Sequence, residues 1–296
     1  MNRNTFLKLM ALSPFAFSSM NLNQLKNLSD NLPDTERMPL LFVGHGSPMN
    51  AIEDNPFTRS LHQTGKDLLA HYQPKAIMVV SAHWLTKGTF VQMSPRPEII
   101  YDFGGFPKAL SEVKYPAIGS PESAKEVSKL VSTIHPTQDW GLDHGSWTIL
   151  KHLFPQANVP VFQLSIDYQR PMSYHFELAQ RLSALRDKGI LIIGSGNVVH
   201  NLPKSFEMMQ QGKEDYQYDW AVTFDNWVKN KLNQRDFQAL TDYTQAGQAG
   251  TLSVPTPDHY IPLLYNVGMA SAKETITTVH ESVVLGGISM RTFRIG

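Results

Sequence analysis

Leu41-Phe-Val-Gly-His-Gly-Ser-Pro48 is the segment from which the fold of this chain can be inferred. Its apolar first half, residues 40–43, predicts a buried strand. The glycines on both sides of His45 permit a tight turn directly after that strand and the close approach of a ligand. Ligands of open α/β sheets bind beyond the carboxyl ends of the strands, so His45 is a candidate functional residue.

Further along the chain, short apolar runs alternate with segments of helical periodicity. The run at 76–81 is apolar up to its last residue, Ser81, as expected of a strand that is covered on both faces. This alternation predicts an α/β protein, a three-layer α/β/α fold with a central mixed, largely parallel sheet. Strands are predicted at 40–43, 76–81, 159–166, 190–194, 274–280 and 287–295, and helices at 55–71, 121–134, 171–188, 215–232 and directly after Thr256-Pro257.

The first part of the chain, residues 1–38, is predicted to be a leader or linker. It begins with a segment similar to a twin-arginine export signal, but Asn4 stands where the second arginine belongs. We therefore expect a cytoplasmic protein, with periplasmic export as the alternative. Residues 39–296 show no boundary in composition and are predicted to form a single domain. No stretch reaches the ~20 apolar residues that a membrane-spanning helix needs.

The composition excludes several classes of site. The chain of 296 residues is 42% hydrophobic and 18% charged, which is typical of a globular protein. Its 26 basic and 26 acidic residues cancel, so the charge gives no reason to expect a nucleic-acid partner. The chain contains no cysteine, so a metal would have to be bound by histidine, carboxylate or backbone oxygen.

Four more histidines lie in short segments rich in Gly, Ser, Pro or Asn, as His45 does. His83 and His200 come after predicted strands, His259 falls in the first turn of a predicted helix, and His144 lies in Asp143-His-Gly-Ser-Trp147. Imidazole binds metal as a neutral ligand and transfers protons near neutral pH. Several imidazoles at one edge of a sheet would make a metal site with an acid–base partner. The other histidines are expected to be surface or structural residues: His62, His71, His135, His152, His175 and His280.

Other motifs were compared with known types of site. Gly194-Ser-Gly196 resembles part of a phosphate loop, but the dinucleotide fingerprint needs a third glycine and a downstream acid. Ser47 and Ser146 each follow a histidine, yet neither lies in the Gly-x-Ser-x-Gly motif of a serine hydrolase. The segment Phe103-Gly-Gly-Phe-Pro107 is interpreted as a rigid aromatic loop beside a pocket.

Taken in order, these motifs resemble the class III extradiol ring-cleavage dioxygenases, the family of the protocatechuate 4,5-dioxygenase catalytic subunit. The resemblance is closest to the branch of 4,5-DOPA extradiol dioxygenases and extends over residues 39–296. It rests on Gly44-His-Gly-Ser-Pro-Met49, Ser81-Ala-His-Trp84, Asp102-Phe-Gly-Gly-Phe-Pro107, Asp143-His-Gly-Ser-Trp147, Gly196-Asn-Val-Val-His-Asn201 and Pro255-Thr-Pro-Asp-His-Tyr260.

The resemblance implies a role for each histidine of the motifs. His45, His83 and His259 match metal ligands, His200 matches an acid–base residue, and His144 matches a pocket residue that contacts substrate or oxygen. The implied substrates are a catechol, such as a DOPA-like compound, and O2, and the implied product is a ring-opened semialdehyde. Fe(II) is the metal implied for this reaction, but three histidines are also a donor set of zinc, so Zn(II) could occupy the same site.

Two other functions remain open at this stage. The same three histidines could activate water in a zinc-dependent hydrolase. The fold could also belong to a non-enzymatic module similar to the Memo proteins.

Asp258, directly before His259, is a candidate to orient the imidazole ring of His259.

Overall fold

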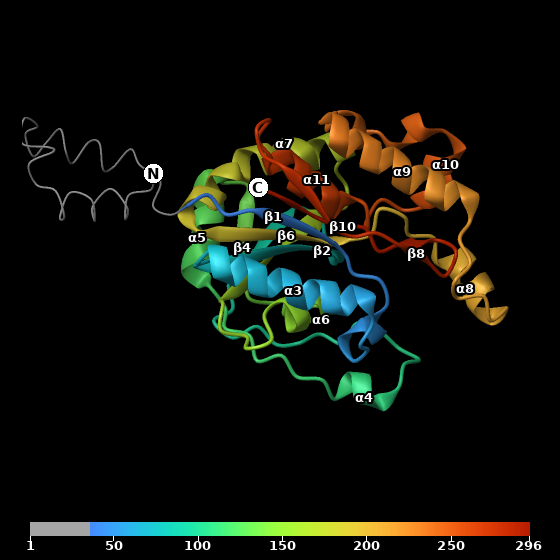
Figure 1. Ribbon diagram of the computed structural model, residues 1–296. Helices are drawn as coiled ribbons and strands as arrows, with labels where there is room; N and C mark the ends of the chain where they lie inside the picture. The colour runs from blue at the N-terminus through green and yellow to red at the C-terminus, as the bar shows by residue number, and fades with distance from the viewer. Residues whose placement is uncertain (1–35) are drawn as a thin grey trace, which may run out of the picture.

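A mixed sheet of eight strands forms the centre of the structure, a computed structural model that describes residues 36–296 (Figure 1). The strand order is β4-β3-β5-β2-β6-β1-β10-β7. The central strands β5, β2, β6 and β1 are parallel, whereas β10 and β7 continue the sheet in antiparallel pairing. The strands are β1 (Leu40–Gly44), β2 (Ala76–Thr86), β3 (Thr89–Gln92), β4 (Ile134–Thr137), β5 (Val161–Asp167), β6 (Ile190–Gly196), β7 (Ile276–His280) and β10 (Thr292–Ile295), with β8 (Val283–Val284) and β9 (Ile288–Ser289) in a separate hairpin.

Helices cover both faces of this sheet, with α3 and α6 on one face and α7 and α11 on the other (Figure 1). The helices are α3 (Pro56–His71), α4 (Lys108–Ser111), α5 (Pro121–Leu130), α6 (His144–Leu153), α7 (Met172–Leu182), α8 (Leu202–Gln210), α9 (Asp219–Gln234), α10 (Gln248–Ser253) and α11 (Ile261–Met269). Short 3-10 helices lie at Pro48–Ala51, Ser183–Lys188, Ala239–Thr241 and Tyr243–Ala246. Within the described residues, no helix is both long enough and apolar enough to cross a membrane.

The two layers of helices pack on two separate hydrophobic cores. In β1, Leu40 and Phe42 belong to one core, whereas Leu41 and Val43 belong to the other. Successive side chains of a strand point to opposite faces, so a strand buried on both faces must be apolar throughout. The predicted three-layer α/β/α fold with a mixed, largely parallel sheet is therefore confirmed.

Two predicted boundaries are wrong because a long-range strand pairing outweighs the local pattern. The strand predicted to end at Ser81 continues to Thr86, since β2 pairs with β5 a second time at Leu85. The helix predicted to extend to Ile134 ends with α5 at Leu130. Ile134 instead begins β4, which pairs in parallel with β3.

Two further corrections concern the C-terminal part of the chain. The helix predicted directly after Thr256-Pro257 begins only at Ile261, where Pro262 occupies the first turn that suits proline, so His259 lies in the preceding turn. The strand predicted at 287–295 is divided into β9 and β10, because β9 pairs with β8 and β10 pairs with β1 and β7. Most of the predicted leader or linker at 1–38 lies outside the described residues.

Candidate metal centre

His45 lies directly after β1, beside the end of the neighbouring strand β6. Its backbone N–H donates to the carbonyl of Gly196 at 3.0 Å. The next residue, Gly46, has a φ of +63°, a left-handed conformation that glycine adopts without steric cost. The Ser195 hydroxyl donates to the carbonyl of Gly145, so it can accept a hydrogen bond from His45 Nδ1, which lies 3.0 Å away. The lone pair of this imidazole is therefore on Nε2.

His83 lies within β2 at an irregularity of the sheet. The pairing of β2 with β5 changes register between Val80 and Leu85, and a bulge of this kind redirects the side chains that it carries. His83 Nδ1 lies 3.5 Å from Asp102 Oδ2, and a carboxylate attracts the protonated ring nitrogen. His83 Nε2 lies 3.2 Å from His45 Nε2. Two lone pairs at this distance repel each other unless a proton or a cation lies between them.

His259 reaches the same place from the turn that precedes α11. Its carbonyl accepts a hydrogen bond of 2.8 Å from the Asn197 N–H. A Cβ added to Gly196 would lie 2.2 Å from the carbonyl oxygen of His259, so this close approach requires glycine. The Asp258 carboxylate accepts a hydrogen bond from His259 Nδ1, which is the contact expected for Asp258. The lone pair of His259 is again on Nε2.

The three rings together form an arrangement suited to a cation. Ring nitrogens of His45, His83 and His259 lie within 4.8 Å of one another. Burial lowers the pKa of His45 and of His83 well below the ordinary value, and repulsion from neighbouring histidines lowers it further. Both rings are therefore neutral at neutral pH. The Nδ1 atoms of all three rings face oxygen atoms, so the Nε2 atoms are the ones available to a ligand, and three imidazole donors fit a first-row divalent metal.

His144 and Asp102 lie at the Nδ1 side of His83. The ring centroids of His83 and His144 are 3.9 Å apart. Asp102 Oδ1 accepts a 2.9 Å hydrogen bond from the His144 backbone N–H, and His144 Nδ1 lies 3.0 Å from the same oxygen as an ion-pair contact without a hydrogen bond. Burial acts to raise the pKa of Asp102, but the contacts with His144 outweigh it and lower the pKa. An ionised carboxylate therefore lies next to both rings.

Helix α6 positions His144 through a buried N-terminal cap. Asp143 precedes the helix, and its Oδ1 accepts from the Ser146 N–H at 3.1 Å and from the Ser81 hydroxyl at 2.6 Å. Gln163 donates to the other carboxylate oxygen of Asp143 at 2.8 Å. Because Ser81 belongs to β2 and Gln163 to β5, this cap ties the first turn of α6 to the sheet beside His83.

The loop after Asp102, predicted to be a rigid aromatic loop beside a pocket, brings aromatic side chains to His144. The Phe103 ring lies edge-on to His144, with centroids 5.8 Å apart and an interplanar angle of 80°. Phe106 packs on Phe103 at 5.6 Å and is 39% exposed. An apolar wall of this kind excludes water from one side of His144.

His200 stacks on His259. Their ring centroids are 3.4 Å apart and the ring planes differ by 7°. The His200 backbone N–H donates to the carbonyl of Ser253 at 2.9 Å, which holds the loop after β6. Burial lowers the pKa of His200 to about 3, with a further contribution from His259. A neutral imidazole next to the converging nitrogens can accept a proton from a bound ligand.

Two residues of this centre, Asp102 and Ser195, had no predicted role in it. Ser195 lies in Gly194-Ser-Gly196, the segment compared above with a phosphate loop. A Cβ added to Gly194 would lie 2.0 Å from Asn266 Oδ1, so the glycines make room for α11 and for the turn of His259. A small polar residue between two glycines at the end of a buried strand was the available signal for Ser195. Asp102 was visible only as part of the aromatic loop.

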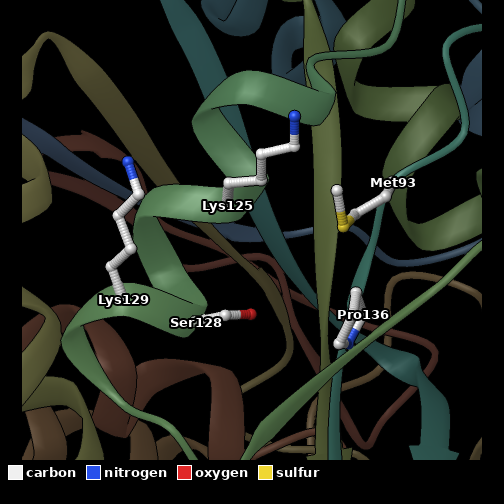
Figure 2. A pocket seen from close by; sticks show the side chains of 5 residues that line it. All are labelled: Met93, Lys125, Ser128, Lys129 and Pro136. Carbon is white, nitrogen blue, oxygen red and sulfur yellow. The ribbon is translucent and has the colours of Figure 1, made fainter.

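The remaining histidines belong to none of the metal-binding clusters found within residues 36–296. His175 is buried and its Nδ1 lies 3.2 Å from the Tyr265 hydroxyl, as expected of a structural residue. His62, His71 and His135 are exposed. A hollow outside the centre also contains no histidine, and Figure 2 shows its lining residues, Met93, Lys125, Ser128, Lys129 and Pro136.

Comparisons with known proteins extend over almost all of the described residues. Residues 39–293 match the family described as the catalytic LigB subunit of aromatic ring-opening dioxygenase. The 4,5-DOPA dioxygenase extradiol of Escherichia coli (strain K12) is 44% identical over 275 residues, which cover 91% of this chain and 98% of that protein. The protein of the same name from Beta vulgaris is 33% identical over 258 residues, 86% of this chain and 92% of that protein. The crystal structure of uncharacterized protein JW3007 from Escherichia coli K12 matches with a TM-score of 0.73 at 40% identity, and the match covers 88% of this chain and 100% of that chain.

Proposed function

Because the chain belongs to the family of LigB catalytic subunits of aromatic ring-opening dioxygenases, we propose that its three-histidine centre opens the ring of a DOPA-like catechol with O2. The chain is an extradiol ring-cleaving dioxygenase, an oxidoreductase that incorporates oxygen. In this reaction the carbon–carbon bond next to the diol breaks, and both atoms of O2 enter the ring-opened semialdehyde. The proposal for the substrate is supported by the names of the two relatives.

The observation that carries the proposal is the convergence of the His45, His83 and His259 rings beside His200. We assign the Nε2 atoms of His45, His83 and His259 as the ligands of one divalent metal. Fe(II) in this position would supply open coordination sites for the two substrates and a path for electrons between them. Zn(II) fits the same donors but has no redox chemistry, so it would occupy the site without supporting ring cleavage.

His200 is the proposed acid–base residue. A half-buried, neutral imidazole has a lone pair available for a catechol proton, and negative charge on the bound catechol would raise the affinity of this imidazole for that proton. The proton stored on His200 can return to an oxygen atom as the ring opens. General acid–base catalysis of this kind contributes about 10²–10⁴-fold to a rate.

His144 is proposed to contact the substrate or oxygen from the opposite side of His83. Its backbone N–H is bound to Asp102, and Phe103 lies edge-on to its ring, so the side chain is held between a carboxylate and an apolar wall.

We further propose that residues 39–296 act as one catalytic domain and that the enzyme works in the cytoplasm. Export through the N-terminal leader is the alternative, which cell fractionation with an antibody to the native chain would test.

The first experiment is O2 uptake after anaerobic reconstitution with Fe(II). DOPA, protocatechuate and simple catechol are offered in turn, and a yellow semialdehyde is followed by absorbance. The expected result is uptake of one O2 per catechol with colour formation, fastest with DOPA. The Zn(II)-loaded protein is the matched control and should consume no O2. Absence of uptake with every catechol, in protein shown to contain stoichiometric Fe(II), would overturn the assignment of this reaction to the centre.

A further inference from the structure

We propose that Asp102 is a positioning residue whose single carboxylate sets the orientation of both His83 and His144. The inference rests on the proposed metal site, but it does not depend on the ring-cleavage reaction. Asp102 would act on the metal through His83 and on the substrate side of the centre through His144.

The backbone delivers Asp102 to this place through a short pairing between two loops. Ile99 forms a parallel bridge with Leu142, the Ile100 N–H donates to the Leu142 carbonyl at 2.8 Å, and the Leu142 N–H donates to the Glu98 carbonyl at 2.7 Å. Asp102 and His144 therefore lie side by side, because each follows closely after the bridge between Ile99 and Leu142. The position of the carboxylate relative to α6 is set by this register and does not depend on the metal.

The carboxylate is divided between the two histidines. Oδ2 lies 3.5 Å from His83 Nδ1, while Oδ1 accepts the His144 N–H at 2.9 Å and lies 3.0 Å from His144 Nδ1. The other two proposed ligands have separate oxygen partners, Ser195 for His45 and Asp258 for His259. Each Nδ1 of the three-histidine set thus faces its own oxygen partner, and Asp102 in addition accepts the backbone N–H of His144, a histidine outside the set.

The substitution Asp102→Asn separates positioning from folding. The remaining amide oxygen can still accept the His144 N–H, so the start of α6 keeps its hydrogen bond. The amide NH2 that replaces the other oxygen is an uncharged donor, so it removes the negative charge that attracts the His83 Nδ1 proton from 3.5 Å. His83 must then turn away or move its proton to Nε2, the nitrogen that faces His45. Loss of an outer partner of a metal ligand typically lowers metal affinity by about 10–100-fold.

The test is a competition titration of the apo-protein with Zn(II) and a chromophoric chelator, together with the visible spectrum of the Co(II) form. We expect Asp102→Asn to lower Zn(II) affinity by about 10–100-fold and to change the Co(II) bands. Asp67→Asn is the matched control, since Asp67 is exposed on α3. Among the described residues its carboxylate accepts only from Gln63, and His71 contacts only its backbone carbonyl, which the substitution keeps. Asp102→Ala is prepared in parallel. The Zn(II) affinity is compared with wild type for whichever variant has the same unfolding midpoint as the wild-type apo-protein. Affinity within twofold of wild type and an unchanged Co(II) spectrum would overturn the inference.

A second measurement separates the two histidines. In a His144→Ala background, Asp102→Asn should still weaken Zn(II) binding by a similar factor, because that effect passes through His83. If the loss of affinity disappears in this background, Asp102 does not act through His83. Both measurements follow metal binding alone, so an inactive wild-type enzyme would refute the proposed reaction and leave this inference standing.

Discussion

Replacing Gly196 by alanine tests whether the close contact between β6 and the turn of His259 builds the metal centre. The added Cβ would lie 2.2 Å from the His259 carbonyl oxygen and 3.1 Å from its carbonyl carbon. A carbon–oxygen contact needs about 3.3 Å, so the turn must retreat by roughly 1 Å. That movement also stretches the 2.8 Å hydrogen bond between the Asn197 N–H and the same carbonyl.

A displacement of this size is large for a metal ligand, because metal–ligand distances hold to within about 0.2 Å. We expect Gly196→Ala to lower the free energy of unfolding of the apo-protein by about 1–3 kcal/mol, as overpacking does. Zn(II) affinity should fall by about 100-fold or more, at or beyond the upper end of the effect of losing an outer partner. Chelator competition and urea unfolding measure the two quantities. Gly104→Ala is the matched control, since its added Cβ would meet no atom within 4 Å. Zn(II) affinity equal to that of the control, in a folded Gly196→Ala protein, would refute the argument.

Three further predictions concern individual histidines. His200→Gln should retain stoichiometric metal and lower turnover by about 10²–10⁴-fold in the O2-uptake assay, and unchanged turnover would remove His200 from the acid–base role. His45→Ala should abolish stoichiometric metal binding, measured by elemental analysis after loading and dialysis, and a full metal complement would show that His45 is not a ligand. Burial lowers the pKa of His175 from 6.5 to about 4. Below pH 6.5 this histidine binds a proton in the unfolded chain, whereas in the folded chain it does so only near pH 4. His175 should therefore lower the free energy of unfolding as the pH falls through this range. His175→Gln should therefore reduce the loss of unfolding free energy between these pH values by up to about 1.4 kcal/mol per pH unit in urea titrations, and equal slopes for the two proteins would contradict this reasoning.

Local patterns in the sequence were enough to predict the class of fold and to name the histidines that the structure brings close together. Apolar runs such as 76–81 indicate strands buried on both faces, and this holds wherever such a run lies in the sheet. Glycine and polar residues around His45 marked a functional turn because few other residues allow that backbone. The family resemblance then supplied expected roles, which came from the order of the motifs and not from any calculated contact.

Only the tertiary structure decided which ring nitrogen of each histidine is available to a metal and which oxygen atom lies against the other ring nitrogen. His45 owes its free Nε2 to Ser195, which lies 150 residues away along the chain, and His83 is paired with Asp102 from a separate loop. Periodicity carries no information on such pairs, because they depend on the order and register of strands that are distant in sequence. The bulge that places His83 within β2 has the same origin, since it arises from how β2 pairs with β5. The residue types that can bind a metal are therefore a property of the sequence, whereas the convergence of their lone pairs is a property of the folded sheet.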